Sequence, residues 1–193
     1  MRIVLVEPQH PGNVGAVARA MANFGITDLA LVNGCEINDD GYARSKSGRP
    51  ILENLKRFDT MEKALADCDI AIGTSGIKPE GDKRWFRAPN DVKKINQLIN
   101  KRENPALIFG RENYGLYREE LALCEVTITI PTNPDYPILN LSHAVGIVLY
   151  EIKRKEKVKS PKKRKAVSQE EFERLVSRIM NMLENSSYPE RRL

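Results

Sequence analysis

Side chains that could take part in chemistry gather in three loops, each of which follows a short apolar or β-branched run. The first loop carries Asn13 and, further along, Arg19, the second carries Glu112, and the third carries Asn140 and Ser142. A guanidinium can bind a phosphate or stabilise a developing negative charge, and carboxylate, amide and hydroxyl groups can orient a substrate. The simpler alternatives are a solvated surface arginine, ordinary turn residues and polar caps of the following helices.

The first two loops are also rich in glycine. In "EPQHPGNVGAVARAM", Gly12 and Gly15 allow close backbone approach, and Asn13 could cap the coming helix, whose buried stripe continues with Val14, Val17, Met21 and Phe24. In "FGRENYGL", glycines bracket Glu112 directly after a buried strand, which indicates a tight turn that directs a carboxylate outward. The glycines alone are weak evidence for a ligand-binding loop, because "GNVGAVA" is only a degraded form of the dinucleotide-binding pattern.

The third loop, "IPTNPDYPILNLSHAVGIVLYE", is stiffened by three prolines. Pro131, Pro134 and Pro137 fix φ and remove three N–H donors, so the segment is predicted to follow an extended path with few backbone partners of its own. Its free carbonyl and amide groups are available to a ligand. Asn140 and Ser142 then either cap the following helix or also face that ligand.

The elements that must position these loops alternate along the chain. Strands are predicted at 2–6, 29–32, 69–73, 106–110 and 126–130, and helices at 13–24, 50–57, 60–67, 90–101, 117–123 and 142–153. Such alternation favours an α/β fold with a mostly parallel sheet and helices on both faces. The three loops would then meet at the carboxyl ends of the strands, where ligands bind in open sheets.

The chain from Glu151 onward has a different composition. Between Glu151 and Lys165, there are nine Lys and Arg residues but only two Glu residues, which is typical of a solvated linker or of an arm that follows phosphates.

Thr60, Asn90 and Ser168 are predicted N-caps, and Ser168 opens an amphipathic helix with a capping box. We therefore expect a main domain at 1–152, a basic linker at 153–167 and a helical segment at 168–193.

Composition excludes several classes of protein. With 41% hydrophobic and 30% charged residues, the chain resembles an ordinary soluble protein, and neither a membrane span nor a signal peptide is predicted. Cys35, Cys68 and Cys124 are widely spaced, and only two histidines accompany them. We therefore expect reduced core cysteines, a cytoplasmic location and no bound metal.

The stretches "NVGAVARAMANFG", "LIFGRENYGL" and "IPTNPDYPILNLSHAVGIVLYE" resemble, in order, the three motifs of SPOUT-class RNA 2'-O-ribose methyltransferases of the TrmH-like branch. The resemblance covers about residues 1–152. It implies a trefoil knot at the C-terminal end of the α/β domain, although chains rarely thread loops, with the proline-rich stretch wrapping S-adenosylmethionine. Family members commonly have serine where this chain has Ile138, so a hydroxyl function does not transfer to that position.

Site residues follow from the resemblance by position. It places the catalytic groups at Arg19, Asn13, Glu112 and Ser142, and the cofactor contacts at Thr74, Ser75, Gly76, Gly110, Ile130, Ile138, Leu139 and Asn140. It also implies a homodimer that methylates a ribose in the tRNA anticodon loop, at nucleotide 32, with cytidine or either pyrimidine as target. Another RNA target such as rRNA, and a non-catalytic RNA-binding module, are the alternatives. Members of this kind often continue further, so the chain is expected to be a shortened form.

Two further hypotheses concern the substrate. The loop "DKRWFRAP" interleaves Lys83, Arg84 and Arg87 with Trp85, as a site for an unstacked base and its phosphates would, although a surface loop anchored by its aromatics is as plausible. Arg19 is expected to bind the target nucleotide and to stabilise alkoxide charge, because a guanidinium is a poor proton acceptor. The stretch 44–48 is a further candidate for RNA contact.

Overall fold

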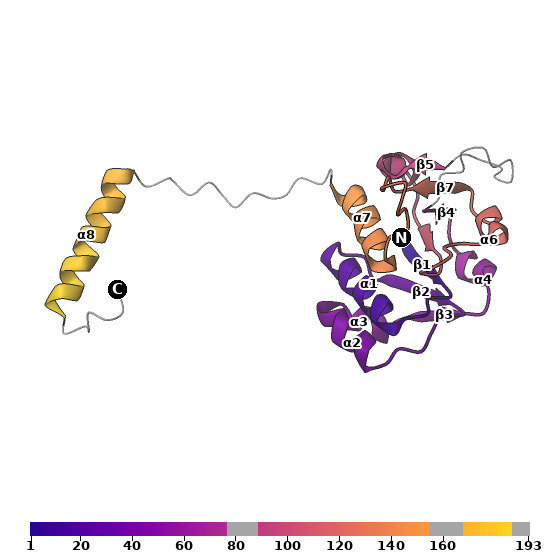
Figure 1. Cartoon of the computed structure of the whole chain (residues 1–193), viewed down its shortest axis with the longest axis horizontal. Coiled ribbons are helices and arrows are strands. Elements are labelled where there is room, and N and C mark those ends of the chain that lie inside the picture. Colours follow the sequence, from indigo (N-terminus) through magenta and orange to yellow (C-terminus); the bar gives the residue numbers. More distant parts are fainter. Residues whose placement is uncertain (77–88, 155–167, 187–193) are drawn as a thin grey trace. The chain divides into compact units, whose positions relative to one another are not determined.

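The computed structural model describes residues 1–76, 89–154 and 168–186. The chain forms two compact units, Met1–Glu156 and Lys157–Leu193, which are drawn in Figure 1. The first unit contains the sheet and the three loops. No helix in the described ranges combines the length and the apolar character needed to span a bilayer.

The first unit is built on one seven-stranded sheet in the order β3-β2-β1-β6-β4-β7-β5. Its strands are β1 (Arg2–Val6), β2 (Asp28–Val32), β3 (Lys56–Phe58), β4 (Ile70–Thr74), β5 (Asn90–Asp91), β6 (Pro105–Phe109) and β7 (Val126–Thr129). All six strand pairs are parallel. The predicted α/β fold with a parallel sheet is confirmed, and the five predicted strands are present with shifts of one residue at some ends.

Helices cover both faces of the sheet. The longer elements are α1 (Pro11–Asn23), α2 (Asp39–Ser45), α7 (Leu141–Lys153) and α8 (Gln169–Asn185), and the shorter ones are η1 (Lys46–Gly48), α3 (Arg49–Glu53), α4 (Met61–Leu65), η2 (Val92–Lys94), α5 (Ile95–Leu98) and α6 (Arg118–Ala122). Strand β1 shows the alternation that this layering requires. Ile3 and Leu5 join the core beneath α1 and α7, whereas Val4 and Val6 join the core beneath α4 and α6.

Several predicted helices are corrected by the structure. The predicted helix at 50–57 ends at Glu53, and residues 56–58 form β3 because they pair with β2 at the sheet edge. The predicted helix at 90–101 begins with β5, so Asn90 lies in a strand and the side chain of Asp91 caps η2 instead. Helix α2, which Asn38 caps, was not predicted. The caps at Thr60 and Ser168 are confirmed, including the capping box at Ser168.

The start of α1 also differs from the prediction. The helix begins at Pro11, with His10 as its N-cap residue, so Asn13 lies in the first turn and is not the cap. Proline is well suited to this position because it has no N–H to leave unpaired. The shift frees the Asn13 side chain for contacts outside its own helix. The predicted buried stripe is confirmed at Val14, Val17 and Met21.

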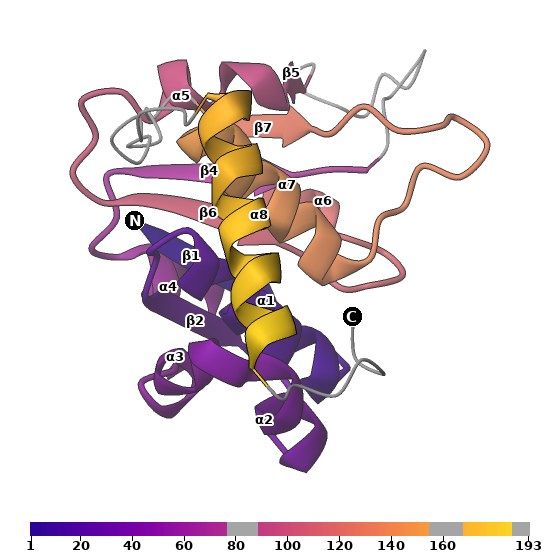
Figure 2. The ribbon, with the colours of Figure 1, turned by 90° about the vertical axis from the view of Figure 1, so that its left-hand side faces the viewer.

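The connection between β7 and α7 leaves the sheet and folds back, as Figure 2 shows. Within it, the Thr132 hydroxyl donates to the Pro137 carbonyl over 3.1 Å, and the N–H of Tyr136 donates to the Asn133 carbonyl over 3.1 Å. Helix α7 then packs against α1. The stiff, proline-rich path predicted from the sequence is thereby brought back toward the first loop.

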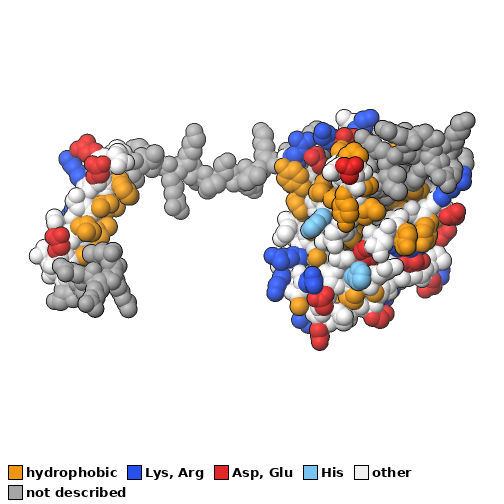
Figure 3. All heavy atoms as spheres, viewed as in Figure 1, with side chains coloured by type: hydrophobic (Ala, Val, Ile, Leu, Met, Phe, Trp, Pro, Cys, Tyr) orange, Lys and Arg blue, Asp and Glu red, His pale blue; other side chains and the backbone are white. Residues whose placement is uncertain are grey.

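The described part of the second unit contains α8, which is amphipathic. Its exposed apolar side chains lie along one face of the helix (Figure 3), namely Phe172, Leu175, Val176, Ile179, Met180 and Met182.

In the first unit, Cys35, Cys68 and Cys124 are all free thiols. Burial raises the pKa of Cys124 to about 12, so this thiol stays protonated in the core.

Candidate active site

The Glu112 carboxylate joins the second loop to the first. It accepts hydrogen bonds from the backbone N–H groups of Gln9 at 3.1 Å and His10 at 3.2 Å, and from Asn13 Nδ2 at 3.0 Å. Partial burial would by itself raise the pKa of Glu112, but the bonds from Asn13 and from the backbone outweigh burial and lower it. Glu112 is therefore an ionised anchor at neutral pH and a weak base.

Asn13 extends this contact to the third loop. Its Oδ1 accepts from Asn140 Nδ2 at 3.0 Å, while its own Nδ2 donates to Glu112. Asn140 Oδ1 accepts in turn from the Ser142 N–H at 2.9 Å and from Ser142 Oγ at 2.7 Å. Asn140 thus caps α7, which is one of the two alternatives left open by the sequence, and it also joins the third loop to Asn13. Neither Asn140 nor Ser142 lines the cavity described below, so contact of these residues with a ligand stays a prediction. One row of hydrogen bonds connects residues more than a hundred positions apart.

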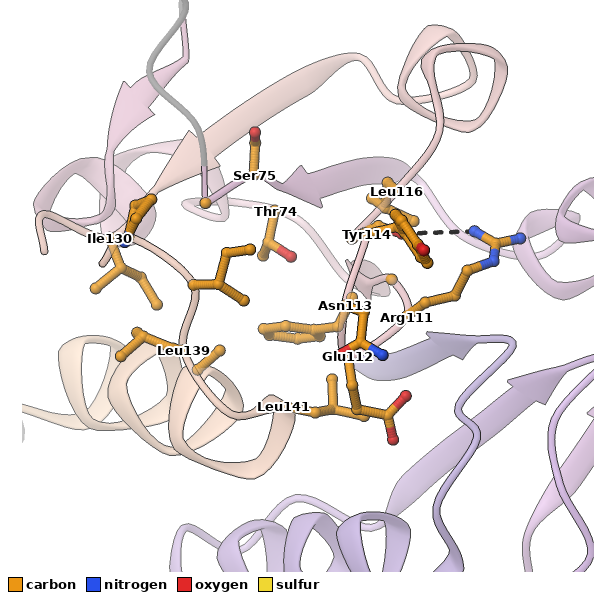
Figure 4. Close-up of a pocket in the computed structure, with 17 residues that line it drawn as sticks. Thr74, Ser75, Arg111, Glu112, Asn113, Tyr114, Leu116, Ile130, Leu139 and Leu141 are labelled. Atoms are coloured by element: carbon orange, nitrogen blue, oxygen red, sulfur yellow. Dashed lines mark hydrogen bonds between the residues drawn. The ribbon is translucent and has the colours of Figure 1, made fainter. Parts of the chain in front are cut away.

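A cavity of about 260 Å³ lies beside this row, between the ends of β4, β6 and β7 (Figure 4). Apolar side chains form much of its lining, including Phe109, Ile130, Leu139 and Leu141. The Thr74 hydroxyl donates to the Ile108 carbonyl over 3.0 Å, so it is oriented by the neighbouring strand. An apolar cavity with a few fixed polar groups is the usual form of a small-molecule site.

The residues predicted to bind a cofactor lie mainly at this cavity. Seven of them line it, namely Thr74, Ser75, Gly76, Gly110, Ile130, Ile138 and Leu139. Asn140 lies instead in the hydrogen-bonded row. Of the predicted catalytic residues, Glu112 lines the cavity and touches Asn13, and Ser142 is joined to them through Asn140.

The turn that carries Glu112 depends on two glycines. A Cβ at Gly110 would lie 2.0 Å from the Gly115 carbonyl carbon, so only glycine permits this approach. Gly115 itself has φ +65°. The backbones of Arg111 and Gly115 exchange two hydrogen bonds, of 3.1 and 2.9 Å, which close the turn.

Arg111 stabilises the same turn from the side away from the cavity, a function that was not predicted from the sequence. Its guanidinium points away from the cavity (Figure 4) and pairs through Nε with Glu7 at 2.8 Å and through both Nη atoms with Glu120 at 3.0 Å. It also lies 3.9 Å from the centre of the Tyr117 ring. Burial alone would lower the pKa of Arg111, but the hydrogen bonds and charges of Glu120 and Glu7 outweigh burial and raise it.

Arg111 and Glu112 therefore bind the first loop at two points from adjacent positions. Arg111 holds Glu7, at the end of β1, and Glu112 holds the two N–H groups that follow Pro8. Glu7 has a positive φ of 46°, which is unusual for a side-chain-bearing residue. The only sequence signal for these contacts is the charged residue Arg111 between Gly110 and Glu112. The first-loop residues that Arg111 and Glu112 bind lie far away in the sequence.

Arg19 is not brought to the cavity of its own chain. It lies on α1, six positions after Asn13, with an exposed side chain. Within the described ranges it has neither a hydrogen bond nor an ion pair. The structure therefore unites Asn13, Glu112, Asn140 and Ser142 but leaves Arg19 apart from them.

The remaining sequence predictions concern RNA and metal. Lys83, Arg84, Trp85 and Arg87 lie outside the described residues. His10 contributes its backbone N–H to the Glu112 contact, and His143 is exposed in the first turn of α7. In the described part of the chain, no group of three or more His, Cys, Asp or Glu side chains could hold a metal ion.

A parallel sheet whose strand ends present three such loops beside one cavity defines a ligand-binding site of the open α/β class. The model of the SpoU rRNA Methylase family matches residues 1–150, and the chain belongs to this family. Its sequence relatives include tRNA (cytidine-2'-O-)-methyltransferase TrmJ of Methanocaldococcus jannaschii, 40% identical over 80% of this chain and 67% of the relative. Another, tRNA (cytidine/uridine-2'-O-)-methyltransferase TrmJ of Photorhabdus laumondii, is 39% identical over 79% of this chain and 64% of the relative. The chain thus spans about two thirds of these relatives.

Solved structures agree with this family. TrmJ from Z. mobilis ZM4 has a TM-score of 0.72 and 32% identity, covering 99% of this chain and 83% of that one. A structure concerned with 2-OH methylation of C/U34 on tRNA has a TM-score of 0.62 and 26% identity, covering 79% and 93%. The SpoU methyltransferase AviRb from Streptomyces viridochromogenes, in complex with AdoMet, has a TM-score of 0.62 and 22% identity, covering 80% and 59%, and supports the fold.

Proposed function

We propose that this chain transfers the methyl group of S-adenosylmethionine to the 2'-hydroxyl of a ribose in the anticodon loop of tRNA. The observation that carries the proposal is the row of hydrogen bonds from Glu112 through Asn13 and Asn140 to Ser142, beside an apolar cavity. The names of the relatives, which are tRNA 2'-O-methyltransferases, support the same reaction.

The cavity fits the cofactor in its chemistry. Its apolar walls suit the faces of an adenine ring, and the glycines at 76 and 110 leave backbone groups accessible. Thr74, Gly110, Ile130 and Leu139 would hold the cofactor there. When bound, S-adenosylmethionine supplies a methyl group that its sulfonium has already activated. The protein then has to align one hydroxyl, since positioning alone can supply about 7–11 kcal/mol of a barrier.

The chain's own residues divide this work. Arg111 and Glu112 fix the turn that walls the cavity, and Asn13 and Asn140 hold Ser142 at the start of α7. Arg19 binds the target nucleotide and stabilises negative charge that develops on its 2'-oxygen, because an arginine keeps its proton and donates from a rigid fork. Water or a substrate phosphate takes the hydroxyl proton.

Arg19 reaches the cavity from a second copy of the chain in this proposal, which makes the enzyme a homodimer. The support is the position of Arg19, which is exposed and lies outside the cavity of its own chain. The two sets of catalytic groups then come together only when two copies associate. Neither copy would be active alone.

The target within tRNA is proposed to be cytidine at nucleotide 32. Cytidine is favoured because the relative with 40% identity is named for cytidine alone, whereas the one with 39% identity is named for cytidine and uridine. Position 34, the site of methylation for which one similar structure is named, is the competing address. An rRNA ribose and a non-catalytic RNA-binding function are the remaining alternatives.

Three finer features complete the proposal. The trefoil knot would involve the loop after β7, and the closeness of that loop to the end of β4 supports it, since a Cβ at Gly76 would lie 3.5 Å from the Pro137 carbonyl oxygen. The basic linker at 153–167 stays a prediction, because residues 155–167 lie outside the described residues, and we propose a cytoplasmic location. RNA contact by Lys83, Arg84, Trp85 and Arg87 stays a prediction.

The decisive experiment is methylation of a panel of unmodified tRNAs with labelled S-adenosylmethionine, followed by mapping of the modified ribose. Transcripts with cytidine or uridine at position 32 and at position 34 are compared. Methylation at C32 is the expected result, and exclusive modification at position 34 would correct the address. Binding of S-adenosylhomocysteine by calorimetry without methylation of any tRNA or rRNA would overturn the proposed reaction.

A further inference from the structure

Four basic side chains lie on α1 and on the three elements that pack against it, α2, η1 and α3. They are Arg19 together with Arg44, Lys46 and Arg49, and we refer to these four residues as the basic ridge. All four are exposed, and the sequence contains no Asp or Glu between residues 41 and 52. Figure 3 shows Lys and Arg side chains grouped on the side of the first unit where Figure 1 labels α1, α2 and α3.

Glycines fix the ridge against α1 by close backbone contact. A Cβ at Gly15 would lie 2.0 Å from the Gly41 carbonyl oxygen, and one at Gly48 would lie 2.4 Å from the Ala18 carbonyl oxygen and 2.7 Å from the Arg19 nitrogen. The segment that carries Lys46 and Arg49 is therefore held against the turn of α1 that carries Arg19. Its position does not depend on long side chains.

The ridge also reaches the first turn of α1. A Cβ at Gly12 would lie 2.8 Å from Arg44 Nε, so the Arg44 side chain rests beside the residue that precedes Asn13. From Gly12 to Arg19 a helix advances about 10 Å, at 1.5 Å per residue. This length is about three times the axial spacing of about 3.4 Å between phosphates on one strand of duplex DNA, so the ridge is long enough to contact more than one phosphate of a nucleic acid.

The ridge residues are available to a partner. Arg44 Nε pairs with Asp40 at 2.8 Å, and Arg49 Nε pairs with Glu53 at 2.9 Å. The side chains of both members of each ion pair are more than half exposed. Such surface pairs are weak and are easily replaced. Lys46, like Arg19, has neither a hydrogen bond nor an ion pair within the described ranges.

The backbone conformation at Lys46 is an independent observation at this place. Lys46 has φ 48° and ψ −118°, a combination that side-chain-bearing residues rarely adopt. Strained positions of this kind often accompany functional sites. A glycine would relieve the strain, yet the sequence has a cation here.

We propose that the basic ridge binds the phosphate backbone of the RNA substrate next to the ribose that Arg19 contacts. The inference rests on the proposed function and extends it to how the substrate is held. Arginine forks can contact phosphates bidentately, and Lys46 adds a mobile point charge. Contacts of this kind carry no sequence information, so the ridge orients the RNA and does not select the base.

The test compares a double variant, Lys46→Gln with Arg49→Gln, with a matched control, Lys94→Gln with Lys101→Gln. The control lysines are exposed, as the ridge residues are, and they lack partners within the described ranges, as Lys46 does. Lys101 also has a positive φ of 63°, like Lys46. Neither control lysine lines the cavity. Binding of a tRNA transcript is measured at several salt concentrations.

We expect the ridge variant to bind tRNA about tenfold more weakly at moderate salt, with a log–log salt slope smaller by between about 1 and 2. The control should match the unaltered chain, and all proteins should bind S-adenosylhomocysteine equally by calorimetry. At saturating tRNA the ridge variant should regain its turnover, so the change lies in KM. Equal salt slopes for ridge variant and control would overturn the inference, as would loss of the dimer in sedimentation, which would make the ridge an interface between copies.

This design separates the ridge from the proposed reaction. If the unaltered chain binds tRNA but methylates none, the reaction is wrong while the salt slopes still test the ridge. If it methylates tRNA and the slopes are equal, the reaction stands and the ridge is wrong.

Discussion

Arg111 lies in the turn that walls the cavity and Arg19 lies on α1 outside that cavity, and the surroundings of these two arginines are opposite. Only 4% of the Arg111 side chain is exposed, and two carboxylates and an aromatic ring surround it. Arg19 is exposed and makes no polar contact within the described residues. Arg111 thus stabilises a wall of the cavity within the chain, whereas Arg19 is the residue that we propose contacts a partner from outside the chain.

In the proposed function, the two arginines serve different sides of the site. The proposed cofactor side is preorganised, because buried and mutually satisfied charges allow few alternative arrangements. The proposed substrate side keeps the Arg19 guanidinium exposed. Variants of the two arginines should therefore fail in different assays.

The largest effect is expected from Arg111→Met. Removing the guanidinium leaves Glu120, which is 17% exposed, and Glu7 without their counter-charge. Breaking a buried ion pair costs about 3–5 kcal/mol, and the lower end applies because the Glu7 side chain is 45% exposed. Urea unfolding measures the loss, and calorimetry should show that S-adenosylhomocysteine binding is lost with it.

The matched control for this variant is Arg44→Met, which removes an exposed ion pair. Its stability should change by about 0–1 kcal/mol. Equal losses in the two variants would show that the Arg111 cluster does not stabilise the turn.

A smaller but still large effect is expected from Arg19→Lys, and it should fall on turnover alone. The change removes a rigid, bidentate donor, and losing one such donor costs about 10²–10³ in rate. Stability and S-adenosylhomocysteine affinity should be unchanged because Arg19 has no partner within the described chain. Near-normal turnover would mean that bidentate geometry is not needed.

Mixing Arg19→Lys with a Glu112→Gln variant tests where Arg19 acts. If Arg19 serves the other copy, mixed dimers contain one intact site and activity returns in part. Persistent inactivity of mixtures that are shown to form mixed dimers would place Arg19 at its own site.

A moderate effect is expected at Asn13, where two substitutions can be compared. Asn13→Ala removes two hydrogen bonds and should lower kcat/KM about tenfold, since bonds to a charged group contribute about 1.5–3 kcal/mol. Asn13→Asp should be worse, because its carboxylate would face Glu112 Oε1, the atom that Asn13 Nδ2 now contacts at 3.0 Å. Similar activity of the two variants would show that the Glu112 charge does not govern this contact.

The smallest effect concerns acidity. The pKa of Glu112 lies below its ordinary value of 4.5, so its contribution to stability is complete above pH 4.5 and is lost as pH falls through the lowered folded-state pKa. Urea unfolding between about pH 3 and pH 6 should therefore show a steeper acid loss in the unaltered chain than in Glu112→Gln. Parallel curves would contradict the prediction.

Much of the fold was predictable because it depends on local patterns. Apolar runs gave the five longer strands, and Thr60 and Ser168 marked helix starts by a side chain that bonds three residues ahead. β3 and β5 were missed because their formation depends on neighbours. Lys56 and Arg57 are exposed, and the two residues of β5 are ordered by pairing with β7. No local window contains that information.

The candidate site was predictable to a similar extent and for similar reasons. The motif resemblance located Asn13, Glu112, Asn140 and Ser142, and the structure joins them. It could not show that Arg111 anchors the turn, because Glu7 lies 104 positions away and the contact exists only after β1 and β6 pair. Nor could it show that Arg19 lies apart from the cavity, which depends on where α1 starts and how it is rotated.

The row of hydrogen bonds through Asn13 has a fixed polarity. An ionised Glu112 can only accept, so Asn13 must present its amide nitrogen to Glu112 and its oxygen to Asn140, which in turn presents its oxygen to Ser142. Every hydrogen bond along the row thus points in the direction of one carboxylate. The last member, the Ser142 hydroxyl, already donates its hydrogen bond to Asn140 and offers lone pairs to whatever approaches. A single negative charge thereby decides that the Ser142 hydroxyl receives a hydrogen bond from an incoming alcohol and does not donate one.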